Sequence, residues 1–247
     1  MASWPFSCGI VVLSIDGKFQ LIQCLQATAE RDVPKSKLTT ALLILLPLSA
    51  VAGYRFDTPE TYLAEASALP AWGDTLERHA DERAAIDDCM LTEEKCEGRL
   101  NGLRIILQKG ANLEPDQQLK LVNRYINKRR YRRDRKQMSL SVAEGGQAKL
   151  RNHWSTLLDF LYRGGDCEDY ATAKYFLLRE LGYQADDMRV VVSYDRSVRQ
   201  HHAVLAIRQA DDSSWLLEID NTIRKSRQSG YRFIYALNEN GIWDHEN

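Results

Sequence analysis

The segment GGDCEDY, residues 164–170, places a single thiol, Cys167, among three carboxylates at the start of a helical pattern. A cysteine in the first turn of a helix lies at the positive end of the helix dipole, which favours the thiolate. The neighbouring acids act in the opposite direction, because each negative charge raises the pKa of a thiol. Reactivity at this position therefore requires an imidazolium beside the sulfur or a cation held by the carboxylates.

Two histidines, His201 and His202, open the apolar run HHAVLAI. Neighbours on a strand point to opposite faces, so only one of them can meet Cys167, and both faces of the run are apolar. The next apolar run, WLLEID, ends at Asp220, a carboxylate that could hold an imidazole in its reactive tautomer. The three residue types form a layout for thiol activation. The alternative is a structural cysteine with common residues aligned by chance.

The spacing of apolar residues predicts the helices that would position this cysteine. Helices are expected over residues 58–69, 74–107, 115–130, 154–162 and 167–181. Gly182 supplies the stop of the last helix, and residues 138–153 read as a loop.

After Gly182, the apolar residues follow a different period. Short runs rich in β-branched and aromatic residues, separated by Asp, Ser, Gly and Arg clusters, predict antiparallel strands over 188–194, 202–207, 214–219 and 232–237. Helices followed by a small antiparallel sheet predict an α+β fold.

Composition and charge limit the classes of function. The 247 residues are 44% hydrophobic with a net charge of -1, which is ordinary globular composition and gives no general attraction to nucleic acid. The basic run KRRYRRDRK, residues 128–136, is a local exception. We expect a solvated helix end there or a docking surface for an acidic partner, and not a nucleic-acid contact. A non-catalytic binding protein remains an alternative to an enzyme.

The N-terminal part has the layout of a secretory signal peptide. Residues 35–53 carry two lysines, an apolar run and then Ala-Val-Ala before Gly53. We expect residues 1–52 to be an N-terminal extension with a signal peptide at 35–52, cleaved on export, and residues 53–247 to be a single domain that is not an integral membrane protein. An uncleaved anchor or a buried helix is the alternative.

After this cleavage the chain would keep Cys89, Cys96 and Cys167. Cysteines seven residues apart on a straight helix lie about 10 Å apart, beyond the roughly 7 Å limit for a disulfide. The residues between Cys89 and Cys96 include no Gly or Pro to force a turn. A bridge and two buried small hydrophobic residues are both left open, and Cys167 is the candidate for reactivity.

The blocks DCEDY at 166–170, HAVL at 202–205 and Asp220-Asn221 resemble, in this order, the bacterial transglutaminase-like cysteine peptidase family. The resemblance extends from about Leu119 to the C-terminus. It implies a papain-like or transglutaminase-like fold, with a helical lobe packed on a small antiparallel sheet. It also implies Cys167 as nucleophile, His202 as general base and acid, and Asp220 as the residue that orients the imidazole.

The resemblance implies a cofactor and a biological role as well. LapG-type members are periplasmic peptidases that flank their cysteine with acids that help bind calcium, here Asp166 and Glu168. They cleave near the N-terminus of a large surface adhesin, which disperses a biofilm, and an inner-membrane cyclic di-GMP receptor commonly restrains them. Acyl transfer to amines, as in transglutaminases, is the rival activity.

Overall fold

The computed structural model describes residues 53–56, 61–133 and 154–245. The predicted signal segment at 35–52 and the predicted loop at 138–153 lie outside these residues. Within the described part of the chain, no helix has the length and apolar character needed to cross a membrane.

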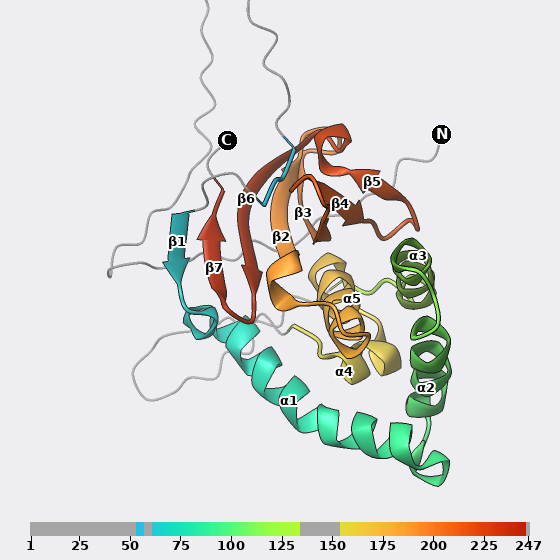
Figure 1. Cartoon of the computed structure of the whole chain (residues 1–247). Helices are drawn as coiled ribbons and strands as arrows, with labels where there is room; N and C mark the ends of the chain where they lie inside the picture. Colours follow the sequence, from blue (N-terminus) through green and yellow to red (C-terminus); the bar gives the residue numbers. More distant parts are fainter. Residues whose placement is uncertain (1–52, 57–60, 134–153, 246–247) are drawn as a thin grey trace, which may run out of the picture. The chain divides into compact units, whose positions relative to one another are not determined.

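The described strands form a 7-stranded antiparallel sheet in the order β1-β7-β6-β2-β3-β4-β5. Figure 1 shows this sheet above the helices. The strands are β1 Thr61–Ala64, β2 Met188–Asp195, β3 Gln200–Arg208, β4 Ser214–Leu217, β5 Ile223–Lys225, β6 Tyr231–Asn238 and β7 Gly241–Asp244.

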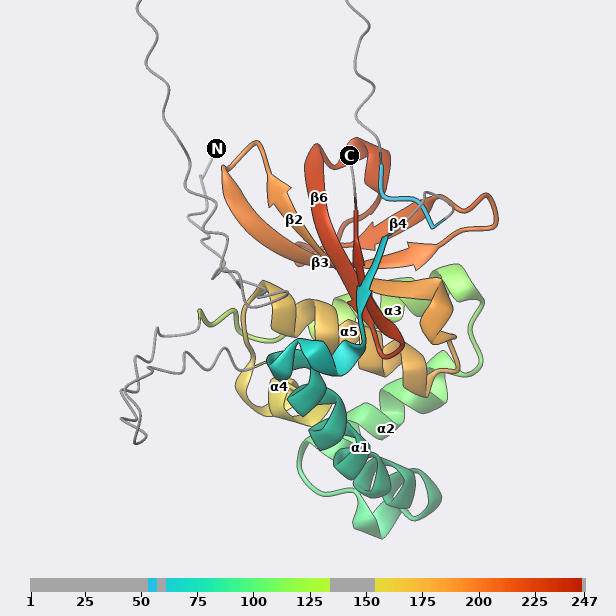
Figure 2. The same ribbon diagram turned by 90° about the vertical axis from the view of Figure 1, so that its left-hand side faces the viewer.

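The helices gather on one face of the sheet, as the view in Figure 2 shows. Helix α5 packs directly on β3 and β2, and α3 and α4 pack on α5. The Trp72 ring of α1 stacks on Phe176 of α5, with ring centroids 5.7 Å apart. The helices are α1 Pro70–Leu91, α2 Arg99–Gly110, α3 Pro115–Ile126, α4 Leu157–Arg163 and α5 Cys167–Glu180. The predicted α+β fold is confirmed.

The opposite face of the sheet carries a second apolar cluster, centred on Tyr54. Residues 53–56 cross this face, and Ser214 and Ser226 donate hydrogen bonds to the Tyr54 carbonyl at 2.7 and 2.9 Å. The Tyr54 ring packs among side chains of β2, β3, β4 and β6, namely Val191, Val204, Ala206, Leu216, Tyr231, Phe233 and Ala236. The central strands are therefore buried on both faces and form a rigid support.

Helix α5 is confirmed almost to the residue, and the other elements differ more from expectation. Residues 58–69 do not form a helix, because 61–64 pair with β7 as an edge strand, and only a short 3-10 turn follows at 66–68. The predicted helix at 74–107 is wrong as one element, since α1 ends at Leu91 and α2 begins at Arg99. Strands β2, β3, β4 and β6 match the expected runs, and β5 and β7 were not expected.

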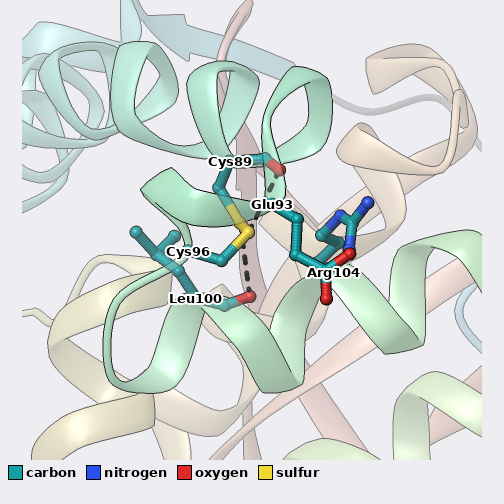
Figure 3. Close-up of a disulfide and its surroundings, with 5 residues drawn as sticks. All are labelled: Cys89, Glu93, Cys96, Leu100 and Arg104. Carbon is teal, nitrogen blue, oxygen red and sulfur yellow. Dashed lines mark hydrogen bonds and ion pairs between the residues drawn. A yellow bond between two sulfur atoms is a disulfide. The ribbon is translucent and has the colours of Figure 1, made fainter.

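The break between α1 and α2 brings Cys89 and Cys96 together in a disulfide, with α-carbons 4.6 Å apart (Figure 3). Thr92 leaves the helix in an extended conformation and residues 93–95 form a 3-10 turn. Glu93 in this turn pairs with Arg104 of α2 at 2.9 Å. The turn therefore needs neither Gly nor Pro, and the open question about the two cysteines is answered by a bridge.

Replacing both Cys89 and Cys96 by alanine is expected to lower the free energy of unfolding. The bridge closes a loop of about eight residues, which in the chain-entropy model stabilises the fold by about 2 to 3 kcal/mol. Urea unfolding of the wild type and the double variant measures the difference. An unchanged unfolding midpoint would contradict the expectation.

Candidate active site

Two adjacent glycines set the start of α5. Gly164 ends α4 with a φ of 69°, and a Cβ there would lie 2.1 Å from the Arg130 carbonyl oxygen. A Cβ on Gly165 would lie 2.0 Å from Asp169 Oδ2. The backbone after α3 runs against this bend, where Arg132 N–H donates to the Gly165 carbonyl at 2.8 Å. The sequence Gly-Gly therefore lets three segments meet at the first residue of α5, which is Cys167.

The three acids around Cys167 are all buried, and they differ in their contacts. Asp169 accepts from Asp166 N–H at 3.1 Å and from Ser155 N–H at 2.7 Å, so it ties the helix start to the segment before α4. Glu168 Oε2 lies 3.2 Å from Cys167 Sγ. Burial, and after it the negative charge of Asp166, raise the pKa of Glu168 well above its usual range. The charge around the sulfur is thus lower than three ionised carboxylates would give.

Cys167 opens onto a cleft of about 790 Å³ that lies between the start of α5, the start of β3 and the segment that follows β4. Both histidines of β3 line the same cleft. Its walls also include Asn127, Arg129, Tyr131, Tyr170, Asp195, Glu218, Asp220, Arg224 and Tyr231. The structure therefore brings the predicted cysteine, histidine and aspartate to one cavity.

The carboxylate that contacts His202 is Glu218. His202 Nε2 lies 3.0 Å from Glu218 Oε2, and Tyr231 Oη donates to Glu218 Oε1 at 2.9 Å. Burial alone would raise the pKa of Glu218, but the hydrogen bond and charge of His202, followed by the charge of Arg224, lower it below its usual value. A carboxylate only accepts hydrogen bonds, so in this contact His202 Nε2 carries the proton and donates it to Glu218.

Asp220 lies in the cleft wall but is turned toward its own loop. Its Oδ1 accepts from Thr222 N–H at 2.9 Å and from Thr222 Oγ1 at 2.6 Å, and its side chain is 59% exposed. The ladder between β3 and β4 stops at Leu217, because Glu218 N–H donates to the Thr222 carbonyl and closes a turn. Among the described residues, Asp220 therefore forms no hydrogen bond with His202.

Sequence reasoning did not single out Glu218, although a signal was present. Residues 218 and 220 lie two apart in the same strand-like run and so share a face. Both were therefore candidates for the imidazole. The turn that begins at Glu218 decides between them.

His201 has different neighbours from His202. Its ring meets Tyr194 edge to face at 5.4 Å, and burial followed by the charge of Arg232 lowers its pKa. Among the described residues, no carboxylate forms a hydrogen bond or ion pair with His201. Of the two adjacent histidines, His202 is the one whose ring is held by an acid.

A buried lysine links the two sides of the cleft. Lys174 of α5 is fully buried, and its Nζ donates to the carbonyls of Leu217 and Glu218 at 2.9 Å each. Burial lowers the pKa of Lys174 to about 7, against the charges of Glu218 and Asp220. The helix that begins with Cys167 therefore fixes the backbone that carries Glu218.

The basic segment is not a helix end, because α3 stops at Ile126 and Tyr131 pairs with Gly165. Arg129 and Tyr131 line the cleft, and the Tyr170 hydroxyl donates to the Arg129 carbonyl. Residues 134–136 of the run lie outside the described part. The segment therefore forms one wall of the candidate active site.

The acids beside Cys167 raise the question of a metal, and the thiol chemistry considered below is that of the reduced cysteine. Among the described residues, no group of three or more His, Cys, Asp or Glu is placed to hold a metal. Asp166 and Glu168 nevertheless offer the hard oxygen donors that calcium prefers.

A cysteine at a helix start, in one cleft with an imidazole held by a carboxylate, defines the class of cysteine-dependent acyl-transfer enzymes. A family model described as bacterial transglutaminase-like cysteine proteinase BTLCP matches residues 84–244. The chain belongs to this family of cysteine peptidases, and the resemblance in its sequence is confirmed. No curated protein sequence matched it.

Solved structures of LapG from Legionella pneumophila share the fold at 22% sequence identity. The structure described as calcium-bound has a TM-score of 0.54, and the match covers 66% of this chain and 88% of that one. An EGTA-treated structure has a TM-score of 0.53, with coverages of 66% and 86%. A further LapG structure has a TM-score of 0.52, and the match covers 64% of this chain and 87% of that one.

Proposed function

We propose that the chain is a cysteine endopeptidase in which Cys167 is the nucleophile and His202 the general base and acid. The observation that carries the proposal is the shared cleft, in which the first residue of α5 and the acid-held His202 ring occur together. Family membership supports peptide hydrolysis as the reaction. The family resemblance implies Asp220 as the orienting residue, but its carboxylate is bound to Thr222, so we assign no orienting role to Asp220.

In the first half of the reaction, His202 takes the thiol proton on Nδ1, since Nε2 already donates to the carboxylate. The Cys167 thiolate attacks the carbonyl carbon of the scissile bond. The Cys167 N–H, at a helix start where no intrahelical acceptor exists, is suited to stabilise the oxyanion. His202 then returns the proton to the leaving amine, and a thioester remains on Cys167.

In the second half, water replaces the leaving amine in the cleft. His202 removes a proton from this water, and the resulting hydroxide attacks the thioester carbonyl. The carboxylic acid product leaves, and the sulfur recovers its proton from the imidazolium. Transfer to an amine would use the same thioester with an amine in place of water.

We further propose calcium as the cofactor, held by Asp166 and Glu168 with backbone carbonyls and water. Both side chains are buried and carry the hard oxygen donors that a divalent cation such as calcium prefers. The calcium-bound and EGTA-treated LapG structures support this choice. When bound, calcium would offset the negative charge beside Cys167.

The proposed substrate is the N-terminal region of a large surface adhesin, whose release would control biofilm attachment. The proposed location is the periplasm, reached through a cleaved signal peptide at residues 35–52, with 53–247 as the mature domain. An inner-membrane cyclic di-GMP receptor is the proposed regulatory partner. These assignments rest on the sequence blocks shared with LapG-type members and on the signal-like layout of residues 35–53.

Alkylation of the reduced protein tests the nucleophile without needing the substrate. At pH 6.5, iodoacetamide is expected to modify Cys167 at least ten times faster than it modifies glutathione, because an activated cysteine has a larger thiolate fraction. Peptide mass mapping assigns the modified residue. A folded protein whose Cys167 stays inert would overturn the proposal.

A further inference from the structure

We infer that Glu218, and not Asp220, is the residue that positions the His202 imidazole for catalysis. The inference rests on the proposed function for its kinetic consequence and on the described contacts for its geometry. It names a positioning residue at a place where the sequence pattern alone points to the neighbouring acid.

The first step of the argument is the contact itself. Glu218 Oε2 and His202 Nε2 are 3.0 Å apart, and the Glu218 side chain is only 4% exposed. A buried ionised carboxylate must be compensated, and Glu218 has the imidazole on one oxygen and the Tyr231 hydroxyl on the other. The contact between Glu218 and His202 is therefore a buried, hydrogen-bonded pair and not a surface ion pair.

The second step is the tautomer that this contact selects. An ionised carboxylate accepts hydrogen bonds only, so it keeps the ring proton on Nε2. The lone pair of the neutral ring is then on Nδ1, the nitrogen available to a thiol proton. As the ring becomes an imidazolium during the reaction, the same carboxylate stabilises its charge.

The third step is rigidity. The Glu218 backbone is held by Lys174 Nζ at 2.9 Å and by Asn127 Nδ2 at 2.8 Å, both on its carbonyl oxygen. Lys174 belongs to the helix that begins with Cys167, so nucleophile and carboxylate are tied to one element. Asp220 lacks such support, since its carboxylate is bound to Thr222 within an exposed turn.

The test uses the full-length reduced protein and the variants Glu218→Gln and Asp220→Asn. Each replaces a carboxylate by its isosteric amide. Glu218→Gln is expected to lower kcat by roughly 100- to 10,000-fold with little change in KM. Asp220→Asn is expected to stay within a few-fold of the wild type. Equal rates for Glu218→Gln and wild type, or a larger loss in Asp220→Asn, would overturn the inference.

A spectroscopic arm separates positioning from simple structural support. Long-range nitrogen-proton NMR of the histidine-labelled protein reports the ring tautomer, and the His202 signals are assigned by their loss in His202→Gln. The wild type is expected to show the Nε2–H form, and Glu218→Gln a mixture. A wild type in the Nδ1–H form would overturn the inference even if the variant failed to fold.

The two arms also separate this inference from the proposed function. A wild type that shows the Nε2–H tautomer but cleaves no protein would refute the peptidase proposal and support the pairing of His202 with Glu218. A cleaving wild type in which Glu218→Gln has no effect on rate or tautomer would leave the peptidase in place and refute the pairing.

Discussion

Replacing His202 by alanine is expected to lower peptide cleavage by roughly 1,000- to 100,000-fold, because the thiol then loses its base and the leaving amine its acid. His201→Ala is the matched control, one residue earlier on the same strand. Its ring packs on Tyr194 and has no carboxylate partner among the described contacts, so a change within a few-fold is expected. Initial rates of cleavage by the two purified variants measure the difference.

Alkylation adds a second readout for the same pair. His202→Ala should also slow the reaction of Cys167 with iodoacetamide at pH 6.5, and His201→Ala should not. Circular dichroism and thermal unfolding check that both variants fold. The reverse ranking, with His201 essential and His202 dispensable, would contradict the assignment of the base.

Removal of calcium is expected to have a comparably large effect. EGTA should lower cleavage by about 100-fold or more, and calcium should restore it where magnesium does not, since magnesium demands tighter octahedral geometry. Calcium should also raise the melting temperature, because a ligand that binds only the folded state at 100 times its Kd stabilises it by about 2.7 kcal/mol.

Carboxylate variants localise the cation. Asp166→Asn and Glu168→Gln should each lose the calcium-dependent rise in melting temperature. Asp116→Asn is the control, because Asp116 is also an acid in the first turn of a helix, α3, but is remote in sequence and exposed. Cleavage that is indifferent to EGTA would refute calcium dependence, and an equal loss in all three variants would refute the assigned ligands.

The parts of the fold predicted correctly are those whose sequence pattern and burial agree. Helix α5 has a regular apolar period and a stop at Gly182, whose φ is 93°. The sequence pattern predicts a helix at residues 61–64, but these residues form strand β1, because their pairing with β7 outweighs their local propensity. The break after Leu91 was missed because it depends on an extended Thr92 and a disulfide rather than on a turn-forming residue.

The site residues also divide into those visible in the local sequence and those that depend on tertiary contacts. Cys167 was found because its type and its place at a helix start are visible in the sequence. The preference for His202 over His201 came from the family motif, and the structure adds a physical reason in the Glu218 contact. Which acid meets the ring depends on where β4 ends and how the turn closes, and the sequence does not reveal the tertiary hydrogen bonds that Lys174 and Asn127 donate to the Glu218 carbonyl there.

Incubating full-length protein with the N-terminal portion of the largest repeat adhesin from the same genome tests the central claim most directly. The reduced wild type and Cys167→Ala are compared on a gel, each with calcium and with EGTA. Fragment masses distinguish hydrolysis from amine transfer. We predict two fragments with hydrolysed ends for the wild type in calcium, and intact substrate in the other three reactions. Cleavage by Cys167→Ala, or no cleavage by the folded wild type in calcium, would contradict the account.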